Sequence, residues 1–230
     1  MDEIDGLCVL LTHPDPASRA QGLELLRLLE PSRLRGRFVG ASLEHLRLEG
    51  VVLPAVELSG ARLNHARLMG SRLSGAHLND AILIGADLTG ADLQGAQLSG
   101  SDLRGANLSR ADLRGACLSG SNLLRASLVG ADLRGARLPD ACLSGADLSH
   151  ADLREAILSG VDLSYARLHG IDLRGARWEA WIDMRHANLS AAKLERLERM
   201  DLCGADLSSV SLSVVAQGKV RWNAQTRWPE

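Results

Sequence analysis

Aromatic residues make up only 3% of this 230-residue chain, which contains one Phe, one Tyr and four Trp. A globular core usually draws on such large side chains, so their scarcity fits better with an interior of small and aliphatic residues. At this length we expect one continuous solenoid with short end pieces, and not two globular domains.

The sequence also lacks the residue clusters that catalysis or metal binding requires. Its four cysteines are scattered without metal-ligand spacing: Cys8, Cys117, Cys142 and Cys203. No nucleophile-elbow motif, phosphate-binding loop or Cys/His cluster is present. We therefore predict a non-enzymatic protein that uses no metal ion and no cofactor.

Neither the charge nor the hydrophobicity of the chain is extreme. The formal net charge is −2, which favours neither a polyanionic nor a polycationic partner, so we expect no direct binding of nucleic acid. No apolar run approaches the length of a membrane span. The start, Met1-Asp2-Glu3, lacks the basic residues of a secretory signal. We expect a cytoplasmic protein that does not bind membranes.

What the chain does contain is a five-residue repeat. Every fifth residue from Leu43 to Leu173 is Leu without exception, with Phe38 before this series and Trp178 after it. Two positions before each Leu stands a small or branched apolar residue, most often Ala. A disordered linker would not keep Leu in register, and a helix would spread a period of five over all its faces. The repeat predicts a coil that keeps turning the same way.

The segment Ala131-Asp132-Leu133 illustrates the geometry expected of each repeat. Residues two apart point to the same side of an extended chain, so Ala131 and Leu133 face inward and Asp132 faces outward. The next two residues, Arg134 and Gly135, must turn the chain. Gly is frequent at this last position, where it tolerates backbone angles that other residues avoid.

A pattern that recurs every twenty residues sets the number of repeats per coil. We call it the Asp–Arg column; its members are Asp92, Asp112, Asp132, Asp152, Asp172, Arg114, Arg134, Arg154 and Arg174. A spacing of fifteen would instead align Asp92 with Asn107 and Asn122, and the pattern would disappear. Four repeats per coil predict a square cross-section. The 29 repeats of residues 36–178 then give about seven coils and a rod about 35 Å long.

Repeats such as Ala-Asp-Leu-Arg-Gly resemble those of the pentapeptide-repeat family, in which a small residue, Asp or Asn, and Leu or Phe precede two variable residues. The resemblance is unbroken over residues 36–178 and continues with interruptions to about residue 212. It implies an all-β solenoid, the right-handed quadrilateral parallel β-helix, in agreement with the square cross-section. It also implies a type of function, because the best-understood members protect bacterial type II topoisomerases by imitating DNA.

Four segments are predicted on this basis. They are an N-terminal helical cap (1–35), the regular β-helix (36–178), irregular repeats (179–212) and a C-terminal capping tail (213–230). Within the first, Asp15-Pro16 predicts the start of a leucine-rich helix that ends by Pro31. This helix would cover the exposed edge of the first coil; a docking helix for a partner is the alternative.

The irregular repeats begin with a shift of register. Six residues separate Trp178 from Met184, which predicts one inserted residue. Residues 190–200 favour a helix by composition, so Leu194 belongs either to a coil or to a helical insertion. In the tail, Trp222 and Trp228 are expected to lie across the open end of the solenoid.

The nine residues of the Asp–Arg column form the candidate interaction surface. Stacked carboxylates about 5 Å apart would repel one another, and the neighbouring arginines offset this repulsion. The column therefore also has a purely structural explanation. As a flat outward surface it offers no concave site for catalysis.

Two functions are consistent with such a surface. One is a scaffold that binds an unidentified protein partner; the other is a DNA mimic that modulates a type II topoisomerase, DNA gyrase. A mimic about 35 Å long would need on the order of 20 uncompensated negative charges. Residues 36–178 hold 15 Asp and Glu against 15 Arg and no Lys, so the balance favours the scaffold. A monomer and an end-to-end dimer both remain open.

Overall fold

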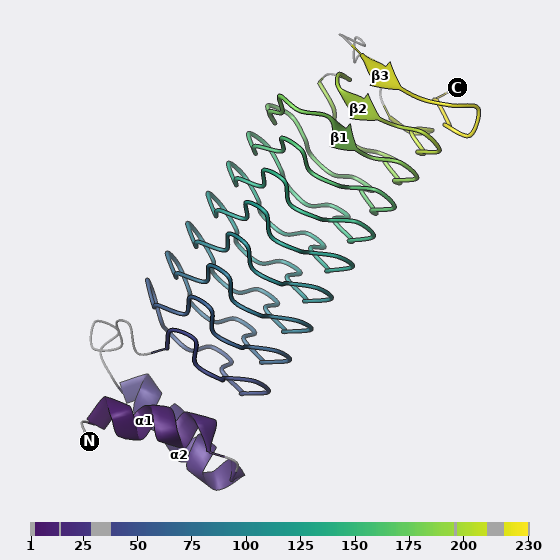
Figure 1. Ribbon diagram of the computed structural model, residues 1–230. Helices are drawn as coiled ribbons and strands as arrows, with labels where there is room; N and C mark the ends of the chain where they lie inside the picture. The colour runs from purple at the N-terminus through teal and green to yellow at the C-terminus, as the bar shows by residue number, and fades with distance from the viewer. Residues whose placement is uncertain (1–2, 14, 29–37, 196, 211–218, 230) are drawn as a thin grey trace.

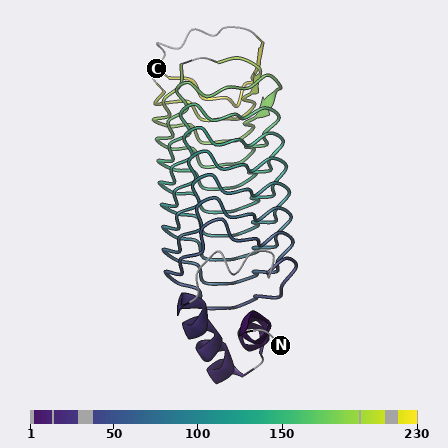
Figure 2. The same ribbon diagram turned by 90° about the vertical axis from the view of Figure 1, so that its left-hand side faces the viewer.

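A computed structural model describes residues 3–13, 15–28, 38–195, 197–210 and 219–229. Helices α1 (Glu3–Thr12) and α2 (Pro16–Leu28) lie at one end of a solenoid of stacked coils (Figure 1). Three short strands lie at the other end and form a parallel sheet in the order β1-β2-β3: Ile182–Asp183, Met200–Asp201 and Val220–Arg221. The view turned by 90° shows that the coils stack into a straight-sided rod (Figure 2).

Each coil of the regular region contains twenty residues. Parallel bridges join positions twenty apart, from Ser42 and Arg62 through to Ile157 and Arg177. The backbone N–H of Leu133, for example, donates to the carbonyl oxygen of Asp152 at 2.8 Å. Because every repeat is paired with the coils above and below, the short strands satisfy their backbone groups without long sheets. The predicted four-sided β-helix is confirmed.

The interior is made of stacked leucines and small residues. The leucines of the five-residue series are all buried, and none is more than 5% exposed. Ala131 is 1% exposed and Leu133 is fully buried, while Asp132 between them is half-buried on the outside. The predicted inward and outward positions are therefore confirmed, and burial of these ladders is the main source of stability.

The corners between faces are tight turns with a fixed backbone requirement. The N–H of Ala136 donates to the carbonyl oxygen of Leu133 at 3.0 Å, and Gly135 between them has a φ of +66°. A positive φ at the third residue is the mark of a type II turn. This explains why Gly recurs at the last repeat position. Residues such as His65, with a φ of +55°, adopt the same conformation at some corners.

The N-terminal end contains two helices, of which the sequence predicted one. The Asp15 side chain accepts the backbone N–H of Ser18 at 2.8 Å, so the predicted cap of α2 is confirmed. Helix α1 was not predicted, although Leu7 and Leu11, four residues apart on its buried side, are the signal that would have shown it. Pro31 and the boundary at 35/36 lie outside the described residues.

Both helices pack on the first coils. Leu11 of α1 and Leu26 of α2 are buried and line a small apolar cavity together with Phe38, Leu43 and Leu48. The helical pair therefore covers the apolar opening of the solenoid, as a cap would.

The C-terminal coils depart from the twenty-residue period. Bridges are 21 residues apart from Asp162 to Asp183, so the predicted insertion after Trp178 is confirmed. The next coil is shorter, since Ile182 pairs with Met200 only 18 residues later. Leu194 is 8% exposed and points inward. Described residues between 190 and 200 form turns and bridges with no helix, so the coil alternative is the observed one.

The end of the chain extends the stack of coils through backbone pairing. Strand β3 pairs with β2, and Arg227 bridges to Asp206. Trp222 is 62% exposed and packs edge-to-face on Trp228, with ring centroids 6.2 Å apart. The prediction that Trp222 lies across the open end is therefore wrong, because the ring points to solvent. The boundary at 212/213 lies outside the described residues.

Candidate interaction surface

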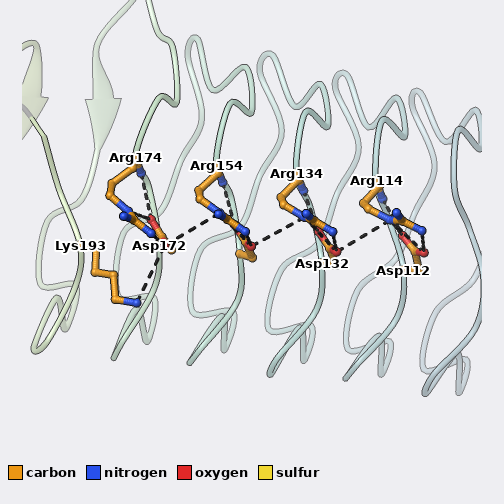
Figure 3. A network of polar contacts seen from close by, with 9 residues as sticks. Asp112, Arg114, Asp132, Arg134, Arg154, Asp172, Arg174 and Lys193 are labelled. Carbon is orange, nitrogen blue, oxygen red and sulfur yellow. Dashed lines mark hydrogen bonds and ion pairs between the residues drawn. The ribbon is translucent and has the colours of Figure 1, made fainter.

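The structure brings all nine residues of the Asp–Arg column onto one face. Parallel bridges connect the aspartates in one unbroken series. Each Asp occupies the outward position of its short strand, and each Arg follows two residues later at the corner. Figure 3 shows the resulting row of side chains across successive coils. The alignment follows from the twenty-residue coil, since equivalent positions must stack.

Each arginine is bound at two points by the aspartate of its own repeat. Nε of Arg134 lies 2.9 Å from Oδ1 of Asp132, and its Nη2 lies 2.7 Å from Oδ2. The backbone N–H of Arg134 also donates to Oδ1 at 3.2 Å. Arg114, Arg154 and Arg174 repeat this arrangement. Two parallel bonds to one carboxylate fix the guanidinium plane far better than a single surface ion pair does.

Diagonal contacts join these pairs along the rod. Nε of Arg114 lies 3.8 Å from Oδ2 of Asp132, and Nε of Arg134 lies 3.7 Å from Oδ2 of Asp152. The corresponding distance from Arg154 to Asp172 is 4.0 Å. Each of these three guanidinium groups therefore contacts the carboxylate of its own coil and that of the next coil. The column is a continuous ladder of alternating charge.

The two ends of the ladder differ from its middle. Asp92 is followed by Gln94, whose backbone N–H it accepts at 3.2 Å, so this first carboxylate has no arginine two residues on. At the other end, Nζ of Lys193 lies 3.9 Å from Oδ2 of Asp172 (Figure 3). Sequence reasoning missed Lys193 because the inserted residue places it 21 positions after Asp172. Correcting the count for that insertion would have found it.

The same two-point pair also occurs on the opposite face, half a coil away from the column. Arg104 binds Asp102 with Nη2 at 2.6 Å from Oδ2, and Arg185 binds Asp183 at the same distance. Sequence reasoning did not single out these pairs, although each has an arginine two residues after its aspartate. They do not stack on one another, so they lack the diagonal contacts of the ladder.

The ladder lowers the pKa of three of its carboxylates. The pKa values of Asp112, Asp152 and Asp172 are all below the ordinary value, and the largest cause is the side-chain hydrogen bond from the arginine two residues later. Partial burial acts in the opposite direction but is outweighed. These aspartates are therefore ionised at neutral pH and compensate the guanidinium charge.

An open groove runs along the edge of this face. It is lined by Arg114, Arg134, Gly135, Arg154 and Glu155. Elsewhere, the described part of the chain holds no group of three or more His, Cys, Asp or Glu side chains arranged to bind a metal ion. None of the helices within the described ranges is both long and apolar enough to span a bilayer.

Two solved structures are similar to this chain, and the first of them shares its fold. Full-length QnrB1, a plasmid-mediated fluoroquinolone resistance protein, is 21% identical with a TM-score of 0.70, over 80% of this chain and 94% of QnrB1. HetL, a pentapeptide repeat protein involved in heterocyst differentiation regulation in the cyanobacterium Nostoc, is 31% identical over 78% of this chain and 86% of HetL, with a TM-score of 0.30. The likeness to QnrB1 concerns the fold.

A comparison with curated proteins finds no match. The family model for pentapeptide repeats, in contrast, matches residues 37–75, 66–105, 106–145 and 141–177. These ranges cover more than half of the chain and fall within the region of twenty-residue coils described above. The chain therefore belongs to the pentapeptide-repeat family.

Proposed function

We propose that this protein is a non-catalytic scaffold that binds another protein through an outer face of its solenoid. The Asp–Arg column is the observation that carries this proposal. Its charged groups are held in fixed positions by two-point pairs on a rod whose coils are joined by regular backbone hydrogen bonds. Side chains that are already ordered lose little conformational entropy when a partner binds, which favours recognition on such a surface.

The non-catalytic part of the proposal rests on how the polar groups are arranged. Catalysis needs a nucleophile, a base and charge-stabilising donors that converge on one point. In the column, by contrast, four of the five carboxylates are each paired with the arginine of their own repeat along a flat face. The cytoplasm is the proposed location, where thiols such as Cys117 and Cys142 remain reduced; both are free here.

Affinity capture from native cytosol tests the scaffold. The full-length chain is immobilised, and the matched control is the Leu133→Asp variant, in which a charge in the buried stack should disrupt the fold. A protein partner retained by the parent and lost from the control is the expected result. Recovery of the same proteins by both, with nothing specific to the folded chain, would contradict the proposal.

A modulator of a type II topoisomerase is the second candidate. It is supported by membership of the family and by the likeness in fold to QnrB1, a plasmid-mediated fluoroquinolone resistance protein. The charge balance disfavours this second candidate, because arginines are interleaved with the longest aspartate series and neutralise it. A gyrase supercoiling assay separates the two candidates.

A further inference from the structure

The two charges of the Asp–Arg column lie at different depths. The Arg114, Arg134 and Arg154 side chains are 41–43% exposed, whereas the carboxylates that they bind are 28–31% exposed. The guanidinium groups therefore form the outer layer of this face. A partner that approaches the rod meets these groups before it meets the aspartates.

Some N–H donors of these guanidinium groups are not used in the described contacts. A guanidinium has five N–H groups, and the described contacts of Arg114, Arg134 and Arg154 use only Nε and Nη2. No contact described for them involves Nη1. The edge of each group that faces away from its aspartate is thus available for a second, charge-assisted interaction with an oxygen acceptor.

The corner beside this row is open to an incoming side chain. A Cβ atom placed at Gly115 or Gly135 would meet no heavy atom within 4 Å. At Gly175, in contrast, the Glu155 side chain covers the corner, with its Cγ 3.4 Å from such a position. The groove is therefore open at Gly135, beside Arg134, and Glu155 lines it on the C-terminal side.

We propose that this groove binds an acidic α-helix of a protein partner, with one carboxylate per helical turn paired to each of Arg114, Arg134 and Arg154. The proposal rests on the scaffold function and names its partner. Neighbouring coils are spaced by about 4.8 Å. An α-helix repeats every 5.4 Å, about 0.6 Å more per step, which long side chains absorb easily.

Other acidic partners fit this spacing less well. An extended strand presents side chains on one side every ~6.7 Å, so over two steps it would miss the arginine row by about 4 Å. Nucleic acid is drawn chiefly by uncompensated positive charge, and here each arginine is already neutralised by an aspartate. Short-range hydrogen bonding with matched spacing is what this surface offers.

Two synthetic helical peptides of identical composition provide the probe. One carries Glu at i, i+4 and i+7 on a single face; the other carries Glu at i, i+2 and i+5, which places the first Glu on the side of the helix away from the other two. Binding to the full-length protein is measured by fluorescence anisotropy at low and physiological salt. We expect the one-face peptide to bind at least about fivefold more tightly than its isomer, since only it can engage three arginines together.

Two variants of the protein should move the affinity in opposite directions. Replacing Arg114, Arg134 and Arg154 by Gln should weaken binding of the one-face peptide by about tenfold or more. Replacing Asp112, Asp132 and Asp152 by Asn should instead tighten it, because the guanidinium charge is released. The Asn variant is expected to fold, since Asn107 and Asn122 already fill this position and accept the same backbone N–H.

Arg104→Gln on the opposite face is the matched control and should leave peptide binding unchanged, because Arg104 has the same local pair without stacked neighbours. Equal affinity for the two peptides, or unchanged affinity in the triple Gln variant, would overturn the proposal. So would equally effective competition by a DNA oligonucleotide of matched charge. If these tests fail while cytosolic capture still succeeds, the acidic helix is refuted and the scaffold stands.

Discussion

Arg134 connects two coils of the solenoid through two aspartates that lie twenty residues apart. Its Nη2 lies 2.7 Å from Oδ2 of Asp132, and its Nε lies 3.7 Å from Oδ2 of Asp152. Stacked aspartates alone would repel one another along the rod. The interleaved arginines convert that repulsion into attraction between coils, so the ladder contributes to stability even if no partner binds it.

The first prediction concerns acid stability. Folding lowers the pKa of Asp112, Asp152 and Asp172, so their contribution is complete above the unfolded-state pKa of about 3.9 and is lost as pH falls through the lower folded value. We expect the melting temperature of the parent to decrease when the pH is lowered below about 4. Replacing these three residues by Asn should make that fall shallower. Identical pH profiles in thermal melts would show that the ladder does not stabilise the fold.

The second prediction compares two adjacent residues. Leu133 is fully buried in the leucine stack, and Leu133→Asp would leave an unpaired charge there, at a cost of several kcal/mol or complete loss of folding. Asp132→Ser on the outer face should cost roughly 1 kcal/mol or less, because an exposed ion pair contributes little. Urea denaturation measures both. Similar midpoints for the two variants would contradict the assigned directions of the side chains.

The third prediction separates backbone strain from crowding at one corner of the solenoid. Gly85 and Gly105 are stacked one coil apart, with φ of +62° and +63°. Replacing either by Ala should cost about 1 kcal/mol through the positive φ. The Gly85→Ala change should cost more, because the added Cβ would lie 2.7 Å from Nδ1 of His65, whereas the space at Gly105 is empty.

A double-mutant cycle tests the origin of that difference. The His65→Ala change should remove the extra cost of Gly85→Ala and leave the cost of Gly105→Ala unchanged. Equal destabilisation by the two glycine substitutions in the presence of His65 would show that the imidazole moves aside freely.

The fourth prediction concerns the N-terminal helices. Leu11 and Leu26 pack over Phe38 and the first leucines of the solenoid. Deleting residues 1–30 should expose this apolar end and its unpaired strand edge, and so promote self-association. Light scattering on the purified truncation measures this. If the truncated protein is instead monodisperse and has the mass of a monomer, the helices do not act as a cap.

Much of the fold could be predicted from the sequence because the repeat leaves few solutions. A chain that places Leu at every fifth position from Leu43 to Leu173 can bury all of them only by coiling. The recurrence of Asp and Arg at twenty then fixes four sides. Features without a period were harder: α1 is short, and the direction of Trp222 depends on how the last coil packs and not on local pattern.

The candidate surface was predictable to a similar extent. Stacking of the nine column residues follows from the coil length, but the two-point geometry depends on the corner backbone, which aims each arginine back at its own aspartate. Lys193 was not predicted as part of the surface, because one inserted residue shifts its position in the sequence but leaves it stacked beside Asp172. The sequence also does not show how exposed each side chain is, so the outer layer of guanidinium groups could be recognised only from the structure.

The last prediction is that the protein is a poor mimic of DNA. A surface that docks onto a DNA-binding saddle needs long-range attraction, and arginines within 4 Å of the aspartates cancel it well inside the Debye length of about 8 Å. We expect no inhibition of gyrase supercoiling at concentrations stoichiometric with the enzyme, and no protection from quinolone-type poisons. The assay on the purified, unmodified chain measures both.

A charge variant shows whether the arginines are the reason. Replacing Arg114, Arg134, Arg154 and Arg174 by Ser leaves Asp112, Asp132 and Asp152 uncompensated, so the face becomes acidic. This variant should acquire weak gyrase binding that disappears as salt is raised, because the new attraction is electrostatic. Potent inhibition or protection by the unmodified protein would make the topoisomerase modulator the correct function. If neither the parent nor the variant binds, charge is not the deciding property, and the faces lack the shape that the enzyme recognises.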